Sequence, residues 1–155
     1  MKIIDVHAHV YPDTIAQRAA DSIGVFYDIP MHMSGTLNEL VQRGTAAGIS
    51  RFVINSAAIT ASRVRSINDY LISAAASDPK RLVGFGTMHP DFEGVADELD
   101  RIRAAGLVGG DGNGVGRHMT AVSGAVFRAG VGKELINLCN KAVGLFQIVA
   151  VFGGF

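Results

Sequence analysis

Apolar and polar residues change their spacing repeatedly along the first two thirds of the chain. Short runs rich in Val, Ile and Leu predict strands over residues 2–10, 51–58 and 81–89, with a fourth strand beginning at residue 107. Between these runs, apolar residues recur at helical spacing. That spacing predicts helices over about 14–23 and 37–47, from Thr60 to about 77, and from Asp91 to about 105.

Residues typical of helix ends support these boundaries. Thr36 is followed three residues later by Glu39, which is a capping-box pattern. Gly48 and Gly106 stand where two of the helices should end, and glycine is the usual residue at that position. The predicted N-caps are Thr36, Thr60 and Asp91.

Alternation of strands and helices with short connections predicts an α/β fold. Its sheet should be parallel and built from right-handed βαβ units. Two architectures suit this repeat, an open doubly wound sheet and a (β/α) barrel. Periodicity alone leaves both of them open.

The character of the chain changes after residue 108. Residues 109–155 hold 11 of the 19 glycines and only six formally charged residues. This part can form a helix over 133–144 and a strand over 145–152. We therefore interpret residues 1–108 as the regular part of the fold. Residues 109–155 are a divergent glycine-rich tail that contributes one helix and one strand to the same domain.

The glycine run GDGNGVG at 110–116 does not predict a nucleotide or calcium site. In the G-x-G-x-x-G pattern that begins at Gly112, the third glycine position holds Arg117. An EF-hand loop beginning at Asp111 would place Val122 where a glutamate is needed. A flexible loop is the better interpretation.

Composition narrows the classes of partner. The 155 residues are 48% hydrophobic, and 14 basic residues balance 14 acidic ones. A balanced charge provides no basic surface for nucleic acid or an anionic membrane, whereas a neutral, apolar chain favours self-association into a homo-oligomer. No apolar run reaches the length of about 18 residues that suggests a membrane span. The single cysteine, Cys139, and an N-terminus without a signal-peptide pattern predict a cytoplasmic protein.

Two histidines stand at the end of the first predicted strand, in MKIIDVHAHV. His7 and His9 are two positions apart, so their side chains should share one face with Cα atoms about 6.5 Å apart. Imidazole nitrogens at that spacing can converge on zinc or a related metal ion, and both residues are candidate ligands. The alternative is a pair of strand-end histidines bonded to nearby backbone. Asp5 is a candidate for orienting a ligand without binding the metal itself.

The stretch MKIIDVHAHVYP resembles the start of the amidohydrolase superfamily, specifically its amidohydrolase-2 branch of metal-dependent hydrolases and decarboxylases. GTLNELVQRGTAAGISRFVINSAA and DPKRLVGFGTMHPDFEGVADELDRIRAAGLVG resemble the second and third βα units of that family. The resemblance covers residues 1–108.

The resemblance implies a (β/α) barrel of TIM type with a divalent metal site, with zinc as the first expectation and manganese as the second. It implies hydrolysis of C–N or C–O bonds in a small-molecule substrate by metal-activated water. A non-oxidative decarboxylase of the same superfamily would share the first strand, so both activities stay open. Only His7 and His9 match the family's ligands residue by residue, and no catalytic residue is assigned.

The length of the chain limits this interpretation. A complete barrel takes about 250 residues, so this chain supplies about four or five βα units. Where the family carries a G-x-K-x-H-P pattern, this chain has GGDGNGVGRHMT, and the aspartate after the last strand has no counterpart. We hypothesise an incomplete barrel, truncated or frame-altered near residue 108 and catalytically incomplete. A non-catalytic, self-associating half-barrel is the alternative from another class.

One further histidine, His89, follows the third predicted strand in TMHP. The carboxyl ends of parallel strands lie at one edge of the sheet, so His89 is a candidate to line the pocket or touch substrate. The alternative is a strand-end histidine held rigid before Pro90.

Overall fold

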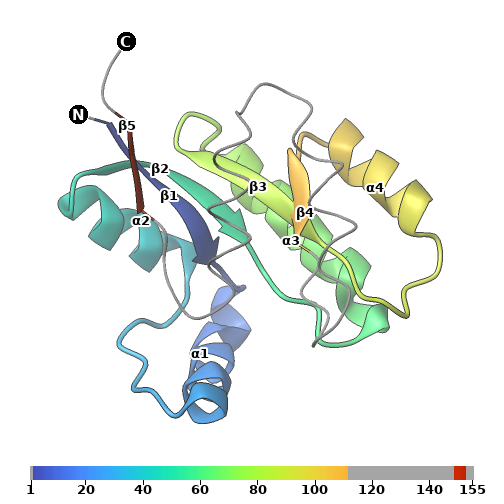
Figure 1. Cartoon of the computed structure of the whole chain (residues 1–155), viewed down its shortest axis with the longest axis horizontal. Helices are drawn as coiled ribbons and strands as arrows, with labels where there is room; N and C mark the ends of the chain where they lie inside the picture. The colour runs from blue at the N-terminus through green and yellow to red at the C-terminus, as the bar shows by residue number, and fades with distance from the viewer. Residues whose placement is uncertain (1, 112–148, 153–155) are drawn as a thin grey trace.

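The computed structural model describes residues 2–111 and 149–152, and its elements follow the predicted alternation (Figure 1). In chain order they are β1 (Lys2–His9), α1 (Asp13–Tyr27), α2 (Leu37–Ala46), β2 (Ile49–Asn55), the 3₁₀ turn η1 (Ala61–Arg63), α3 (Val64–Ser77), β3 (Leu82–Thr87), α4 (Val95–Ala104), β4 (Gly109–Asp111) and β5 (Val149–Phe152). The helix predicted over 133–144 lies outside the described residues. Within those residues, no helix is long and apolar enough to cross a membrane.

Five strands form one sheet in the order β4-β3-β2-β1-β5. The pairs β1–β2, β2–β3 and β3–β4 are parallel, which confirms the predicted parallel sheet for these four strands. β5 departs from that prediction, because it runs antiparallel to β1 with Val151 opposite Ile3 (Figure 1). Its backbone groups thereby pair with an edge of β1 that would otherwise be open.

The helices α2 and α3 cover the same face of the sheet. A Cβ on Gly44 of α2 would overlap the ring of Phe52 in β2, and one on Gly84 of β3 would lie 3.0 Å from the Cβ of Ala75 in α3. Phe52 and Gly84 share that face, because Gly84 is the register partner of Ile54, two residues after Phe52. Winding on one face is typical of (β/α) barrels, whereas a doubly wound sheet carries helices on both faces.

The hydrophobic core lies between this face of the sheet and the helices. Its largest fully buried apolar side chains come from β2, α3 and the residue that follows β1, and are Val10, Phe52, Ile54, Val64 and Leu71. Burying a side chain of this size contributes about 1.5–3 kcal/mol, so this one face supplies most of the driving force for the fold.

The start of α2 confirms the predicted capping chemistry. The backbone N–H of Glu39 donates to the Thr36 hydroxyl oxygen at 3.3 Å. The Glu39 carboxylate reaches past Thr36 and accepts the backbone N–H of Ser34 at 2.7 Å. Two donors at the helix entrance are therefore satisfied by side chains.

The prediction that Asp91 caps the fourth helix is wrong. Residues 89–92 form a turn in which the Phe92 N–H donates to the His89 carbonyl at 3.0 Å. α4 begins only after Gly94, whose φ of 80° is a left-handed conformation that glycine adopts without strain. The residues around Pro90 have therefore formed a turn instead of a helix capped by Asp91.

Other boundaries shift by a few residues. Thr60 precedes the 3₁₀ turn η1 rather than α3 itself, and its side chain makes no capping hydrogen bond. β1, β2 and β3 end one to three residues before the predicted limits, at His9, Asn55 and Thr87.

The contact between Gly44 and Phe52 generates a stability prediction. Replacing Gly44 with alanine forces the added methyl group into the Phe52 ring, and α2 or the ring must move. We expect Gly44→Ala to lower the free energy of unfolding by about 1–3 kcal/mol, the usual cost of overpacking. The measurement is urea denaturation of the full chain. Thr45→Ala, at an exposed neighbouring position of α2, is the control, and equal midpoints for the two variants would contradict the prediction.

Candidate functional site

His7 and His9 converge at the carboxyl end of β1. Their Nε2 atoms lie 2.9 Å apart, and their ring centroids are separated by 4.8 Å. The strand alternation that the sequence predicted therefore does bring the two imidazoles together on one face. His7 is exposed, whereas His9 is partly buried beneath it.

Asn55, the last residue of β2, completes the immediate surroundings of His7. The register pairs Asn55 with His9, and its Nδ2 lies 3.2 Å from Nδ1 of His7. The Asn55 side chain is 2% exposed. The sequence pattern does not single out this residue. The available signal was a lone amide ending the apolar run RFVIN, but its role depends on which strand pairs with β1.

Asp5 lies deeper in β1 and is fully buried. Its Oδ1 accepts the backbone N–H of His7 at 3.1 Å. The register between β1 and β2 also shifts between Asp5 and Ala8, so this bond stands where the strand is irregular. This hydrogen bond from the His7 N–H to the Asp5 carboxylate holds the backbone of His7 in place.

The environment of His9 favours its neutral form. Burial, and secondarily the charge of His7, lowers the pKa of His9 from 6.5 to about 4. A neutral imidazole has a free lone pair on one nitrogen, which is the form that binds a metal. His9 therefore keeps a ligating nitrogen at all pH values near neutrality.

Tyr11 forms a wall beside His9. The two rings stack with centroids 6.5 Å apart and an angle of 25° between their planes. Tyr70 of α3 holds the backbone of Tyr11 in place, because its hydroxyl donates to the Tyr11 carbonyl at 2.9 Å. Burial, with Asp13 nearby, raises the pKa of Tyr70 to about 12, so this hydroxyl remains a donor.

His89 lies just beyond β3, at the edge where β1 and β2 also end. Its Nδ1 accepts the backbone N–H of Asp91 at 3.2 Å. This bond ties the ring to its own loop, and Nε2 is the nitrogen left for any contact with a ligand. The carboxylate of Asp91 lies 3.9 Å from the same Nδ1.

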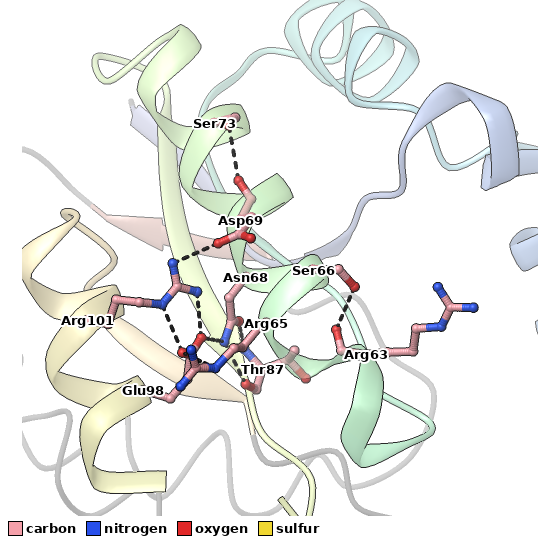
Figure 2. A network of polar contacts seen from close by, with 9 residues as sticks. All are labelled: Arg63, Arg65, Ser66, Asn68, Asp69, Ser73, Thr87, Glu98 and Arg101. Carbon is pink, nitrogen blue, oxygen red and sulfur yellow. Dashed lines mark hydrogen bonds and ion pairs between the residues drawn. The ribbon is translucent and has the colours of Figure 1, made fainter. Parts of the chain in front are cut away.

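Asn68 of α3 is buried and its side-chain amide binds the backbone at the end of β3 (Figure 2). Its Oδ1 accepts the backbone N–H of Thr87 at 2.6 Å, and its Nδ2 donates to the Thr87 carbonyl at 3.2 Å. The Thr87 hydroxyl in turn accepts the N–H of Ala58, three residues after Asn55, at 3.1 Å. The ends of β2 and β3 are thus tied to α3 by side chains that sequence analysis did not identify.

Glu98 of α4 extends the same network (Figure 2). Its fully buried carboxylate accepts Nδ2 of Asn68 at 2.8 Å, and Arg101 donates to both of its oxygens at 2.9 and 2.7 Å. The hydrogen bonds from Arg101 are the main cause that holds the pKa of Glu98 below its usual range. Arg101 also binds Asp69 of α3 at 2.7 Å, which links the two helices at the surface.

The histidine pair fits two ligand positions of one metal ion. Two nitrogens each about 2.0–2.1 Å from an ion lie about 2.9 Å apart at a right angle and about 3.3 Å apart at a tetrahedral angle. Nδ1 of His9 and Oδ1 of Asn55 are buried without a hydrogen-bond partner in the described structure, so the site is polar but incompletely satisfied. No third His, Cys, Asp or Glu joins the pair within the described ranges.

The sequence matches the amidohydrolase family over residues 4–143. The chain belongs to that family. No protein of curated function matches the sequence.

Two solved structures are similar to part of this chain. One is 4-oxalomesaconate hydratase from Rhodopseudomonas palustris, with 18% identity, a TM-score of 0.45, and coverage of 70% of this chain and 41% of the hydratase. The other is 2,6-dihydroxybenzoate decarboxylase with 2,6-dihydroxybenzoate bound, with 20% identity, a TM-score of 0.45, and coverage of 71% and 38%. The chain therefore spans less than half the length of either protein.

The Asn68 network generates a prediction about stability. Asn68→Leu keeps the side-chain volume but removes both partners of the Thr87 backbone and one partner of the buried Glu98 carboxylate. We expect a loss of about 2–4 kcal/mol in the free energy of unfolding, because buried polar groups are left unpaired. Urea denaturation measures it. Asp69→Asn, which weakens only an exposed ion pair, should cost much less, and a loss as large as that of Asn68→Leu would contradict the prediction.

The low pKa of His9 predicts a pH dependence of the metal-free chain. Between pH 6.5 and about 4 the unfolded chain binds a proton at His9 that the folded chain does not. The free energy of unfolding therefore falls as the pH falls, by at most about 1.4 kcal/mol per pH unit from this group.

Denaturation midpoints at pH 6.5, 5.5 and 4.5 with a chelator present measure this slope. His9→Gln should make it shallower, whereas His32→Gln, at an exposed loop position, should leave it unchanged. An identical slope in the wild type and His9→Gln would show that His9 is not the group responsible.

Proposed function

We propose that this chain carries the first-strand metal ligands of a metal-dependent hydrolase that acts on C–N or C–O bonds in a small-molecule substrate. The observation that carries the proposal is the convergence of the His7 and His9 Nε2 atoms at 2.9 Å. Membership in the amidohydrolase family supports it, because divalent metals are typical of that superfamily.

The residues around the pair have distinct roles in this proposal. A divalent ion, with zinc as the first choice and manganese as the second, supplies Lewis acidity that polarises a carbonyl group and activates water. His7 and His9 hold the ion, and Asp5 fixes the backbone beneath His7. Tyr11 shields one side of His9. In this proposal His89, which follows β3, is the residue that contacts substrate.

The one-sided winding of α2 and α3 supports a second part of the proposal, that β1 to β4 are consecutive strands of a (β/α) barrel. Sites in such barrels lie at the carboxyl ends of the strands, where His9 and Asn55 are found. In this arrangement the face opposite the helices is the barrel interior. Catalytic zinc sites use three protein ligands, and His7 and His9 supply two of them in this proposal.

Metal content tests the proposal directly. The full chain is purified, incubated with zinc or manganese, desalted and subjected to elemental analysis. We expect about one divalent ion per chain in the wild type and a loss of that ion in the His7→Ala/His9→Ala double variant.

His32→Ala is the matched control, since it removes an exposed histidine in the loop between α1 and α2 and should keep the ion. Equal metal content in the double variant and the wild type would place the ion elsewhere. A wild type without metal would contradict the proposed function.

A further inference from the structure

The contact between Asn55 and His7 carries an inference about how the histidine pair is controlled. Nδ2 of Asn55 lies 3.2 Å from Nδ1 of His7, and Nε2 of His7 lies 2.9 Å from Nε2 of His9. The three side chains thus form a continuous chain of contacts. At its start, Oδ1 of Asn55 is buried without a partner in the described structure.

With the Asn55 amide oriented as the structure has it, these contacts select one tautomer for each imidazole. A neutral imidazole has one N–H and one lone pair. When Nδ2 of Asn55 donates to Nδ1 of His7, that nitrogen supplies the lone pair and the proton sits on Nε2 of His7. This Nε2–H then donates to Nε2 of His9, which leaves the proton of His9 on its Nδ1. Every contact in the chain has one donor and one acceptor.

Metal binding requires a different state of His7 alone. A metal-bound Nε2 needs its lone pair, so the proton of His7 must move to Nδ1 and find an acceptor there. The lone pair of His9 already sits on Nε2 and needs no change. An asparagine can serve both states, because half a turn of its amide exchanges a donor for an acceptor at the same place.

We propose that Asn55 is a positioning residue that selects the tautomer of His7. In the metal-free chain its amide N–H faces Nδ1 of His7, and in the loaded chain the amide has turned so that Oδ1 accepts Nδ1–H. The inference rests on the proposed metal site. It adds that His7 is held out of its ligating form until the metal arrives, and that the backbone does not have to move for the change.

Two substitutions separate the two states. Asn55→Asp offers only acceptors when ionised, so it should hold His7 as the Nδ1–H tautomer even without metal. Asn55→Leu offers neither group at similar volume, so His7 loses its preference and the site loses a ligand-orienting contact. Such contacts typically contribute 10- to 100-fold in metal affinity.

The experiment is nitrogen-15 NMR of the histidine rings in the full chain at pH 8, where neutral imidazoles dominate, without metal and with one equivalent of zinc. Zinc affinity is measured in parallel by competition with a chelating dye. In the wild type we expect His7 to change from Nε2–H to Nδ1–H on zinc binding, while His9 remains Nδ1–H.

The variants give the second readout. Asn55→Leu should bind zinc about 10- to 100-fold more weakly than the wild type. Asn55→Asp should show Nδ1–H on His7 before zinc is added, because a carboxylate at this place offers only acceptors to Nδ1. Asn38→Leu, at an exposed asparagine on α2, should match the wild type in both measurements.

The outcomes distinguish this inference from the proposed function. If the wild type binds zinc at His7 and His9 but His7 keeps one tautomer throughout, or if Asn55→Leu binds zinc equally well, the role of Asn55 is wrong and the metal site stands. If the wild type binds no zinc, both fail. Should Asn55→Leu not fold, the tautomer of His7 in Asn55→Asp decides the matter.

Discussion

Parallel pairing between β1 and β2 brings the last residue of each strand, His9 and Asn55, to one edge of the sheet. Everything in the candidate site depends on this register. A slip of one residue would turn Asn55 toward the helices and leave His7 without its neighbour, because side chains alternate between the two faces of a strand. The apolar residues of β2 prevent that slip, since Phe52 and Ile54 must face α2 and α3 to stay buried.

The buried network around Asn68 has a complementary role on the far side of the sheet. Hydrophobic packing is tolerant of small sliding movements, whereas a side chain bonded to both backbone groups of Thr87 is not. Through Thr87 and Ala58 this rigidity reaches the loop that follows Asn55. The histidine pair therefore stands on an edge whose position is set by directional bonds as well as by apolar contacts.

Contacts between residues that are close in sequence could be predicted, whereas contacts between residues that are far apart could not. The capping pair Thr36 and Glu39 and the shared face of His7 and His9 depend on residues within a few positions of one another, and both were predictable. Asn55 and His7 are 48 positions apart, and Asn68 and Glu98 are 30 apart. Such contacts exist only once the order of strands and helices is known.

The same reasoning explains two further departures. Asp91 has the side chain of a good N-cap, but residues 89–92 form a turn instead of the first turn of a helix. α4 therefore begins only after Gly94. The antiparallel direction of β5 could not follow from the strand-like pattern of 145–152, because a run of apolar residues does not encode which edge it will join or in which direction.

The segment that carries α1 leaves the sheet and returns to it at a single place. The N–H of Tyr11 donates to the carbonyl of Gly35 at 2.9 Å, and Tyr11 also forms a bridge with Thr36, so the two ends of the excursion are fastened together. When the two ends of a segment are bonded to each other, its length can change without moving the strands to which it is attached. We therefore expect the length of residues 12–34 to be variable without displacing Tyr11 from its place beside His9.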